Sequence, residues 1–315
     1  MNYPNDFINK IIYGDCLIEH EIINSGSVDL ILTDLPYGTI KGLGGNIKKY
    51  ERLSNSDWDN IIDTKEIYKI ANRILRKNGK MVLFANQPFT TELINNAIPN
   101  LPHCYNMYWD KMHFANCLVA NKAPVSYMED ILIFSKIYDF EGIHPLRPYF
   151  KKVIEFIGQN KKAIIEKIGQ SVDHVFRYGS SQFNLCTEET YNELIKVFSI
   201  DKMIGFRTFT EISKESDGFL NTFNLWEGGK YKSNILRYRK DYDGYHPTQK
   251  PILLLEDLIK TFSNEDDLVV DLTAGSGSTA VACINTKRDY IVIEKEDKYI
   301  EIIRNRISAI PELLF

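Results

Sequence analysis

Residues 34–37 read D-L-P-Y and combine, over four positions, the groups that could hold the amino group of a planar base. Asp34 offers a carboxylate acceptor, Leu35 a main-chain carbonyl held beside Pro36, and Tyr37 a flat ring for stacking. Two acceptors that bind the two hydrogens of an amino group favour a tetrahedral, more nucleophilic nitrogen, and stabilise the positive charge that develops on it. This segment therefore suggests the transfer of a group to an exocyclic amino nitrogen.

A glycine-rich segment near the end of the chain is the second candidate for chemistry. Residues 271–279 read D-L-T-A-G-S-G-S-T and lead into an apolar stretch typical of a helix start. Glycines let the backbone approach a ligand closely, and a helix N-terminus favours a negative group such as a carboxylate. The next predicted strand ends at Glu294, whose carboxylate could accept from both hydroxyls of a ribose. By itself the pattern also fits a dinucleotide site or a purely structural turn.

Both segments follow apolar runs that we predict to be buried strands. The first run is 28–32 and the second is 267–271, with a further strand at 290–293 and a helix at 297–310. Open α/β sheets bind their ligands at the carboxyl ends of the strands, where both segments would lie. The chain ends at residue 315, shortly after this unit, so the rest of the sheet must come from the N-terminal part. We therefore predict a doubly wound α/β sheet whose catalytic half precedes its cofactor half.

Six segments, taken in order, resemble the motifs of the amino-methylating, S-adenosylmethionine-dependent DNA methyltransferases of the permuted (beta) type. They are G-D-C at 14–16, D-L-P-Y at 34–37, W-D-K at 109–111, E-D-I-L-I-F at 129–134, H-P-T-Q-K-P at 246–251 and the glycine-rich segment at 271–279. Two positions depart from the family pattern: Leu35 replaces the first proline of D-P-P-Y, and L-T-A at 272–274 replaces P-F-x. The main-chain carbonyl at position 35 is retained, so we expect activity to survive.

The resemblance implies a circularly permuted, Rossmann-like methyltransferase sheet with a mainly helical target-recognition insertion. Residues 1–144 would form the catalytic half, 145–245 the target-recognition region and 246–315 the cofactor-binding half. It also implies a site-specific enzyme that transfers a methyl group from S-adenosylmethionine to N6 of adenine in double-stranded DNA. The transfer would be direct and in line, after the base has been flipped out of the duplex.

The resemblance also assigns roles to individual residues of this chain. Asp15 would bind the adenine of S-adenosylmethionine, Glu294 its ribose, and Asp271 its amino group, while Thr248 and Lys250 would bind its carboxylate. Viewed alone, Asp15 could equally be a helix N-cap. The predicted catalytic residues are Asp34, Leu35, Pro36 and Tyr37, and the predicted cofactor residues are Asp15, Thr248, Lys250, Asp271, Thr273, Gly275, Ser276, Gly277, Thr279 and Glu294.

The middle of the chain is predicted to recognise the DNA sequence. From about residue 145 to 245 the α/β alternation lapses, and short amphipathic helices are predicted at 149–157, 161–168, 171–176 and 187–198. Their order suggests either a helix-turn-helix or an ordinary helical insertion with a solvated lysine face. Basic residues outnumber acids at 147–167 and again at 228–240, where tyrosines interleave with them. The predicted DNA-binding residues are Lys151, Lys152, Lys161, Lys162, Lys230, Lys232, Arg237 and Arg239.

The composition fits a protein of the cytoplasm, and the family resemblance implies a bacterium or a phage-infected cell. The formal net charge is −4, so a basic DNA-binding face must be local. Five cysteines are scattered without the spacing of a zinc site or a disulfide framework, and no metal site is predicted. No apolar run has transmembrane length, and the first residues lack a signal-peptide pattern.

Other functions stay open on the sequence alone. N4-cytosine methylation uses the same geometry, but that group commonly has serine where this chain has Asp34. Enzymes that methylate RNA or a protein side-chain amide usually begin the motif with asparagine. A DNA-binding regulator with a silent methylase fold is disfavoured by four retained residues: Asp34, Tyr37, Gly275 and Gly277. The expected partners are double-stranded DNA and a cognate restriction endonuclease, with the protein acting as a monomer or a homodimer.

Overall fold

The structure is a computed structural model that describes residues 8–36, 62–115, 120–122, 124–138, 144–180, 182–220, 223–241, 243–245 and 248–310. The chain divides into two compact units. The larger unit contains the chain up to Leu75, Gly79–Ile137 and the chain from Phe223 onwards, and the smaller contains Arg76–Asn78 and Tyr138–Thr222. Tyr37 and His246 lie outside the described residues.

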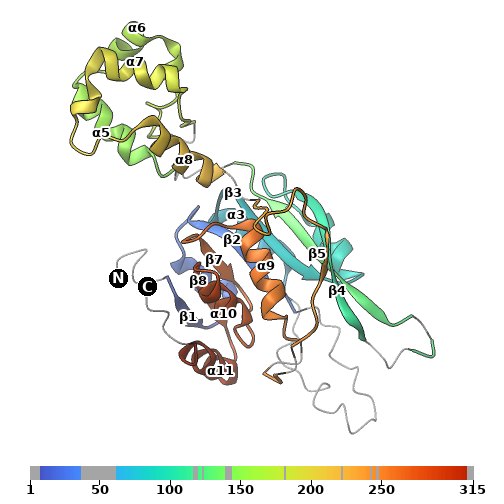
Figure 1. Cartoon of the computed structure of the whole chain (residues 1–315). Coiled ribbons are helices and arrows are strands. Elements are labelled where there is room, and N and C mark those ends of the chain that lie inside the picture. Colours follow the sequence, from blue (N-terminus) through green and yellow to red (C-terminus); the bar gives the residue numbers. More distant parts are fainter. Residues whose placement is uncertain are drawn as a thin grey trace. The chain divides into compact units, whose positions relative to one another are not determined.

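The larger unit is built on one sheet of eight strands, whose spatial order is β1-β8-β7-β2-β3-β5-β4-β6 (Figure 1). All of these described strands run in one direction except β5, which is antiparallel to its neighbours β3 and β4. In chain order the strands are β1 (Lys10–Tyr13), β2 (Val28–Thr33), β3 (Leu75–Ala85), β4 (His103–Ala115), β5 (Ser126–Ser135), β6 (Ile235–Arg237), β7 (Leu268–Asp271) and β8 (Asp289–Glu294).

The centre of the sheet brings the two ends of the chain together. Strands β7 and β8, from the C-terminal part, lie between β1 and β2, from the N-terminal part. From β2 the sheet continues to β3 on one side, whereas from β7 it continues to β8 on the other. This reversal makes a topological switch point, at which ligands bind outside the carboxyl ends of the strands. The predicted permuted, doubly wound sheet is confirmed.

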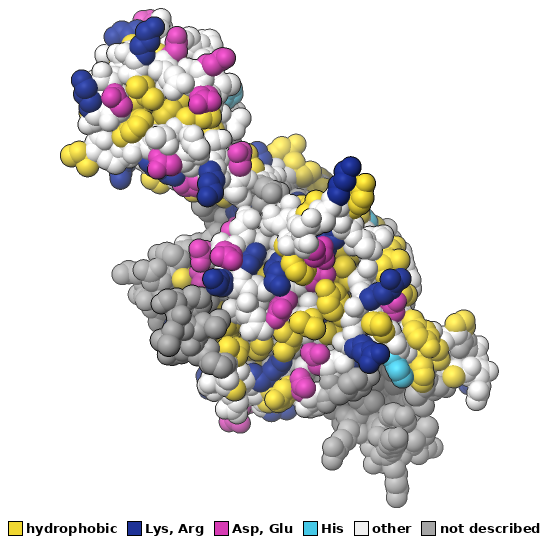
Figure 2. Space-filling model, viewed as in Figure 1, with side chains coloured by type: hydrophobic (Ala, Val, Ile, Leu, Met, Phe, Trp, Pro, Cys, Tyr) yellow, Lys and Arg dark blue, Asp and Glu magenta, His cyan; other side chains and the backbone are white. Residues whose placement is uncertain are grey.

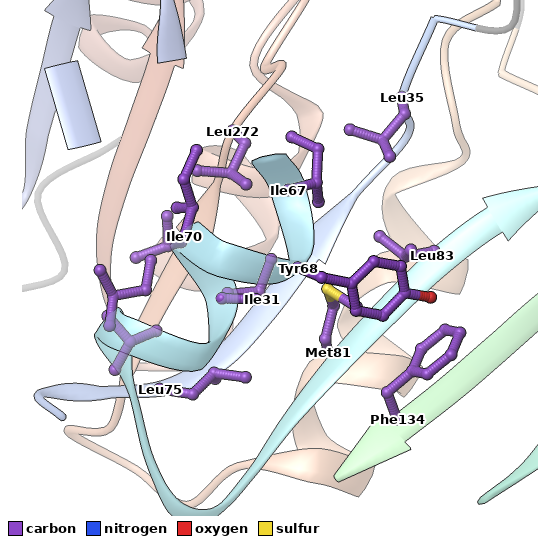
Figure 3. Close-up of a cluster of buried hydrophobic side chains, with 14 of the residues drawn as sticks. Ile31, Leu35, Ile67, Tyr68, Ile70, Leu75, Met81, Leu83, Phe134 and Leu272 are labelled. Carbon is purple, nitrogen blue, oxygen red and sulfur yellow. The ribbon is translucent and has the colours of Figure 1, made fainter. Parts of the chain in front are cut away.

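Two hydrophobic cores cover the two faces of the sheet, because successive strand residues point to opposite sides. In β2, Ile31 joins the core that includes α3, whereas Leu30 joins the core that includes α9 and α10. In the first core the ring of Tyr68 packs edge-on against Phe134, with 5.5 Å between centroids (Figure 3). The helices of this unit are α1 (Cys16–Glu19), α3 (Thr64–Ile74), α4 (Phe89–Asn95), α9 (Ile252–Phe262), α10 (Ser278–Asn285) and α11 (Asp297–Ser308), with a 3₁₀ turn, η1, at His20–Ile22.

The smaller unit is helical and has a hydrophobic core of its own. The predicted helices at 149–157, 161–168 and 187–198 are confirmed, whereas 171–176 holds only the end of a 3₁₀ turn followed by further turns. Its elements are α5 (Arg147–Ile157), α6 (Lys161–Ile168), η4 (Gln170–Val172), α7 (Glu188–Phe198), η5 (Ile200–Lys202) and α8 (Phe209–Leu220). The turn at 158–160 has the length of a helix-turn-helix turn, but the link from α6 to α7 is much longer. The helix-turn-helix therefore stays a prediction.

The smaller unit is also shorter than the predicted region 145–245. Residues 223–245 belong to the larger unit, because Ile235–Arg237 pair with β4 and extend the sheet. Every helix in the described part of the chain is too short or too polar to span a lipid bilayer.

Candidate active site

The two candidate loops meet at the switch point between β2 and β7. These strands are paired in parallel, with Ile31 beside Val270, so the residues that follow them leave the sheet side by side. The Thr273 hydroxyl donates to the main-chain oxygen of Asp34 at 3.0 Å. The hydroxyl oxygens of Thr33 and Thr273 are 2.7 Å apart, which adds a second contact between the loops. The loop that carries Asp34 therefore lies directly against the glycine-rich loop.

Leu35 fixes the backbone of the first loop through its side chain. That side chain is 2% exposed and joins the core that contains Ile67 of α3 and Leu272 after β7 (Figure 3). A leucine buried in this way resists displacement, because exposing it would cost about 2 kcal/mol of burial. The packing holds the backbone at the position where the family pattern has a proline.

A buried lysine binds the carboxylate of Asp34. The Lys250 ammonium forms an ion pair with Asp34 Oδ2, and Lys250 Nζ lies 3.1 Å from Glu129 Oε1. Lys111 continues the chain of charges, with its Nζ 2.8 Å from Glu129 Oε2. The side chains of Lys111, Glu129 and Lys250 are only 6%, 7% and 9% exposed, whereas that of Asp34 is 23% exposed. We call these four residues the Asp34 ion-pair network.

The network is balanced in charge, and its members shift one another's protonation. Burial alone would lower the pKa of Lys250, but the carboxylates of Asp34 and Glu129 outweigh it and raise that pKa above its ordinary value. Burial would raise the pKa of Glu129, yet Lys250 and Lys111 lower it overall. Burial, together with the charge of Lys111, lowers the pKa of nearby Lys240. The pKa shifts of Lys250 and Glu129 therefore both favour the charged forms of these two groups.

The glycine-rich loop is held by two buried acids. Burial raises the pKa of Asp271 to about 6, although the carboxylate accepts from Thr279 Oγ1 at 2.6 Å and from the Thr273 amide at 3.1 Å. Glu294, at the end of β8, accepts from the Gly275 amide at 2.7 Å, and burial raises its pKa as well. Each acid thus binds the loop on a different side.

The G-D-C turn reaches the same end of the sheet through β1, which pairs with β8. The Gly14 amide donates to the main-chain oxygen of Glu294 at 3.0 Å. Asp15 is the N-cap of α1, where it accepts from the Leu17 amide at 2.9 Å. The structure therefore places Asp15 beside the candidate cofactor residues and also gives it a capping role.

Three polar residues surround the start of α10. Ser276 is 3% exposed, and its main-chain oxygen accepts from Arg306 at 2.7 Å. Its hydroxyl lies 3.5 Å from Gln249 Oε1. The Nε2 atom of Gln249 is buried and has no hydrogen-bond partner among the described residues. A buried amide donor of this kind is costly unless a ligand or water completes it.

Some of the predicted DNA-binding residues are exposed, some form ion pairs, and Arg237 does both. The prediction for Lys232 is wrong. Its side chain is 2% exposed and pairs with Asp257 at 2.5 Å, so it stabilises the fold and is not available to contact DNA. Lys161 binds Asp173 at 2.6 Å, and Arg237 lies 3.4 Å from Asp110. The exposed members are Lys151, Lys152, Lys162, Lys230, Arg237 and Arg239. On the face that Figure 2 presents, basic side chains of the helical unit are interspersed with acidic ones.

Sequence reasoning missed Lys111, Glu129 and Gln249 as site residues. Lys111 and Glu129 ended and began two of the matched motifs, so a signal for both was present. Their pairing was not visible, because it depends on the register that sets Trp109 opposite Glu129 across β4 and β5.

The proteins that this chain resembles in sequence are DNA methyltransferases. The sequence profile of a DNA methylase family matches residues 28–305. The type II methyltransferase M.HindIII of Haemophilus influenzae is 34% identical over 96% of both chains. The DNA adenine methyltransferase YhdJ of Escherichia coli is 26% identical over 97% of this chain and 86% of its own.

Solved structures share the fold at low sequence identity. The M1.HpyAVI–SAM complex has a TM-score of 0.53 at 18% identity, covering 95% of this chain and 98% of its own. The cytosine-N4-specific PvuII DNA methyltransferase also has a TM-score of 0.53, at 16% identity, covering 94% of this chain and 85% of its own. The fold is thus shared with a cytosine-N4-specific enzyme, so it does not by itself decide the target base.

Proposed function

The chain belongs to the DNA methylase family, and from that premise we propose that it methylates N6 of adenine in double-stranded DNA with S-adenosylmethionine as donor. The observation that carries the proposal is the hydrogen bond from the Thr273 hydroxyl to the Asp34 carbonyl. It holds an amino-binding loop against a glycine-rich cofactor loop, as direct transfer requires. The relative named as an adenine methyltransferase, and the aspartate at position 34, favour adenine over cytosine.

The residues around the glycine-rich loop fit S-adenosylmethionine. Gly277 has a φ of +76°, and a Cβ there would meet Ile303 Cγ1 at 2.7 Å, so the loop is closed to side chains at this point. The buried Gln249 donor suits a carboxylate, Asp271 suits an ammonium, and Glu294 suits ribose hydroxyls. When bound, S-adenosylmethionine supplies an electrophilic methyl group.

Asp34 and Leu35 bind the amino group that receives the methyl group. The Asp34 carboxylate, with 23% of its side chain exposed, accepts one hydrogen of the target amino group, and the Leu35 carbonyl accepts the other. Together they stabilise the positive charge that develops on the nitrogen. The proton that leaves the nitrogen is drawn toward the carboxylate. Tyr37, which lies outside the described residues, keeps its predicted role of stacking on the flipped base.

The smaller unit is proposed to recognise the DNA sequence. Its exposed lysines, Lys151, Lys152 and Lys162, are suited to phosphate contacts. Lys230, Arg237 and Arg239 offer further basic groups on the larger unit. The type II relatives favour a cognate restriction endonuclease as partner and a bacterial cytoplasm as the place of action, and both stay predictions.

The decisive experiment measures which nucleoside receives the methyl group. Protein is incubated with methyl-labelled S-adenosylmethionine and duplex DNA, and the DNA is digested to nucleosides and separated. Label in N6-methyldeoxyadenosine supports the proposal, whereas label in N4-methyldeoxycytidine assigns the alternative base. Parallel reactions with RNA and a protein extract test the other enzyme classes. DNA binding without labelled product would instead indicate a regulator.

A further inference from the structure

We propose that Lys250 is a positioning residue that holds the Asp34 carboxylate in place and in its charged form during methyl transfer. Glu129 and Lys111 in turn hold Lys250. The inference rests on the proposed function, because it assigns a role in the same reaction. It differs from the expectation drawn from the family resemblance, which placed Lys250 at the carboxylate of the cofactor.

The position of the Lys250 ammonium is fixed on several sides. It pairs with Asp34 on one side and lies 3.1 Å from Glu129 on another, and it sits 4.9 Å from the centre of the Phe84 ring. A lysine ammonium has three donors, and these contacts direct them. The side chain is 9% exposed, so water competes little for the ammonium. These contacts place the ammonium so that it acts on the substrate through Asp34.

The members of the Asp34 ion-pair network differ in solvent exposure. Asp34 is its most exposed carboxylate, at 23%, whereas Glu129 is 7% exposed and Lys111 is 6% exposed. A base can approach Asp34 from the open side while the lysine holds it from the buried side. Buried charges are costly and gain little for stability alone, so a chain of them that ends at the catalytic loop suggests a catalytic purpose.

The charges that face Asp34 explain why the ammonium is needed. The carboxylate must be ionised to accept from an amino group. Asp271, on the neighbouring loop, is close enough for the two carboxylates to repel each other, and Glu129 adds a second negative charge nearby. Lys250 forms an ion pair with Asp34, while Lys111 binds Glu129 and the charge of Lys240 interacts with Lys111, Glu129 and Lys250. An adjacent cation favours the ionised carboxylate by a large factor.

The test replaces Lys250 with methionine, which keeps the length of the side chain and removes its charge. Single-turnover methylation is measured from pH 5 to 9, and the affinity for S-adenosylmethionine is measured by calorimetry. We expect the rate at neutral pH to fall by about 10²-fold. The acid limb of the pH profile should move to higher pH by about one unit or more. The affinity for S-adenosylmethionine should stay within about twofold of wild type.

Three further variants separate this role from a loss of folding. Lys250→Arg keeps the positive charge and should restore the acid limb toward the wild-type position. Glu129→Gln removes a negative charge from the network, so its rate should fall without an upward shift of the limb. Lys232→Met removes a buried ion pair with Asp257, which is not a member of the Asp34 ion-pair network, and should leave the profile unchanged.

The outcomes distinguish this inference from the proposed function. Wild-type protein that methylates no DNA overturns the proposed function and this inference with it. An active wild type, combined with a Lys250→Met variant that binds S-adenosylmethionine at least tenfold more weakly and keeps the acid limb, assigns Lys250 to the cofactor. If Lys250→Met instead keeps the wild-type rate and pH profile, the ion pair between Lys250 and Asp34 has only a structural role. Either of the last two results overturns the inference alone.

Discussion

At the scale of single residues, Leu35 shows how a motif can change one side chain and keep its geometry. The family pattern has a proline here, which fixes the backbone through its ring. This chain fixes the backbone by burying the leucine side chain in the core beside Ile67 and Leu272. The proposed reaction needs only a main-chain oxygen from position 35, and either residue supplies one.

Asp34→Asn should separate binding from turnover. The amide keeps the size of the side chain, but one of its two termini donates, so it accepts poorly from an amino group. We expect the rate of methyl transfer to fall about 10²- to 10³-fold, while the affinity for S-adenosylmethionine is retained. Single-turnover kinetics and calorimetry on the same preparation check this. A parallel loss of cofactor affinity would show that Asp34 serves the cofactor loop instead.

Asp271 should make the stability of the protein depend on pH. Burial raises its pKa to about 6 in the folded protein, whereas an unfolded chain has a value near 3.9. Between about pH 4 and pH 6 the folded state therefore binds more protons, and this residue's contribution to stability falls as pH rises through that window. In Asp271→Asn this titration is absent.

Urea unfolding of wild type and Asp271→Asn at several pH values measures the effect. The free energy of unfolding of wild type, relative to the variant, should decline from about pH 4 to pH 6 and then level off. A constant offset between the two is expected from the lost hydrogen bond and does not affect the test. Parallel curves across the whole range would contradict the assignment.

At the scale of elements, most of the architecture follows from local sequence patterns. The strand before Asp34 and the βαβ unit after residue 267 were predicted with bounds close to those of β2, β7 and β8. The segment 171–176 was predicted wrongly as a helix, because Val172, Val175 and Phe176 have helical spacing. In the structure they fill the core of the smaller unit from successive turns.

Helix α8 was not predicted although its start carries a recognisable signal. Thr208 and Glu211 form a capping box, in which the Thr208 amide donates to Glu211 Oε2 at 2.7 Å. The T-x-x-E pattern was therefore readable, but Gly218 and the many polar residues of the segment obscured it. The ion pairs of Lys250 were not readable at all, since they join residues far apart in sequence.

Gly277→Ala should damage the start of α10 and the loop before it. The residue has a φ of +76°, which disfavours any side chain, and its Cβ would lie 2.7 Å from Ile303 Cγ1. We expect a loss of about 1–3 kcal/mol in the free energy of unfolding and weaker cofactor binding. Gly205→Ala is the matched control: its φ is +81°, but nothing lies within 4 Å of the added Cβ, so it should cost less and leave cofactor binding unchanged. Equal losses of stability in the two variants would show that the backbone conformation, and not the contact with Ile303, causes the loss.

At the scale of the whole molecule, the boundary of the smaller unit was the least predictable feature. Strand β6 has only three residues, and Ile235 and Leu236 are its sole apolar members. So short a run gives no strand signal by itself. It nevertheless pairs with β4, and residues 223–245 therefore belong to the larger unit. Lys232 lies in this segment and forms a buried ion pair with Asp257. The composition of the segment could not reveal that this lysine is buried.

Removing exposed lysines of the smaller unit should weaken DNA binding uniformly across sequences. In Lys152→Ala/Lys162→Ala both changed residues are exposed and helical. If each contacts a phosphate, the slope of log affinity against log salt should become shallower by about two. Lys298→Ala changes an exposed lysine of α11 in the larger unit, and as the control it should leave the slope unchanged. Titration of a fluorescent duplex at several salt concentrations measures it, and an unaltered slope in the double variant would remove this surface from the interface.

The central position of β7 has a consequence for biosynthesis. A ribosome releases β1 and β2 long before β7 and β8, so each has an unpaired edge until its partner emerges: residues 268–271 for β2 and residues 289–294 for β1. Unpaired edges invite association with other chains. Nascent protein is therefore most exposed to aggregation just before its last strands are made, and a premature stop near residue 260 would leave that state permanent.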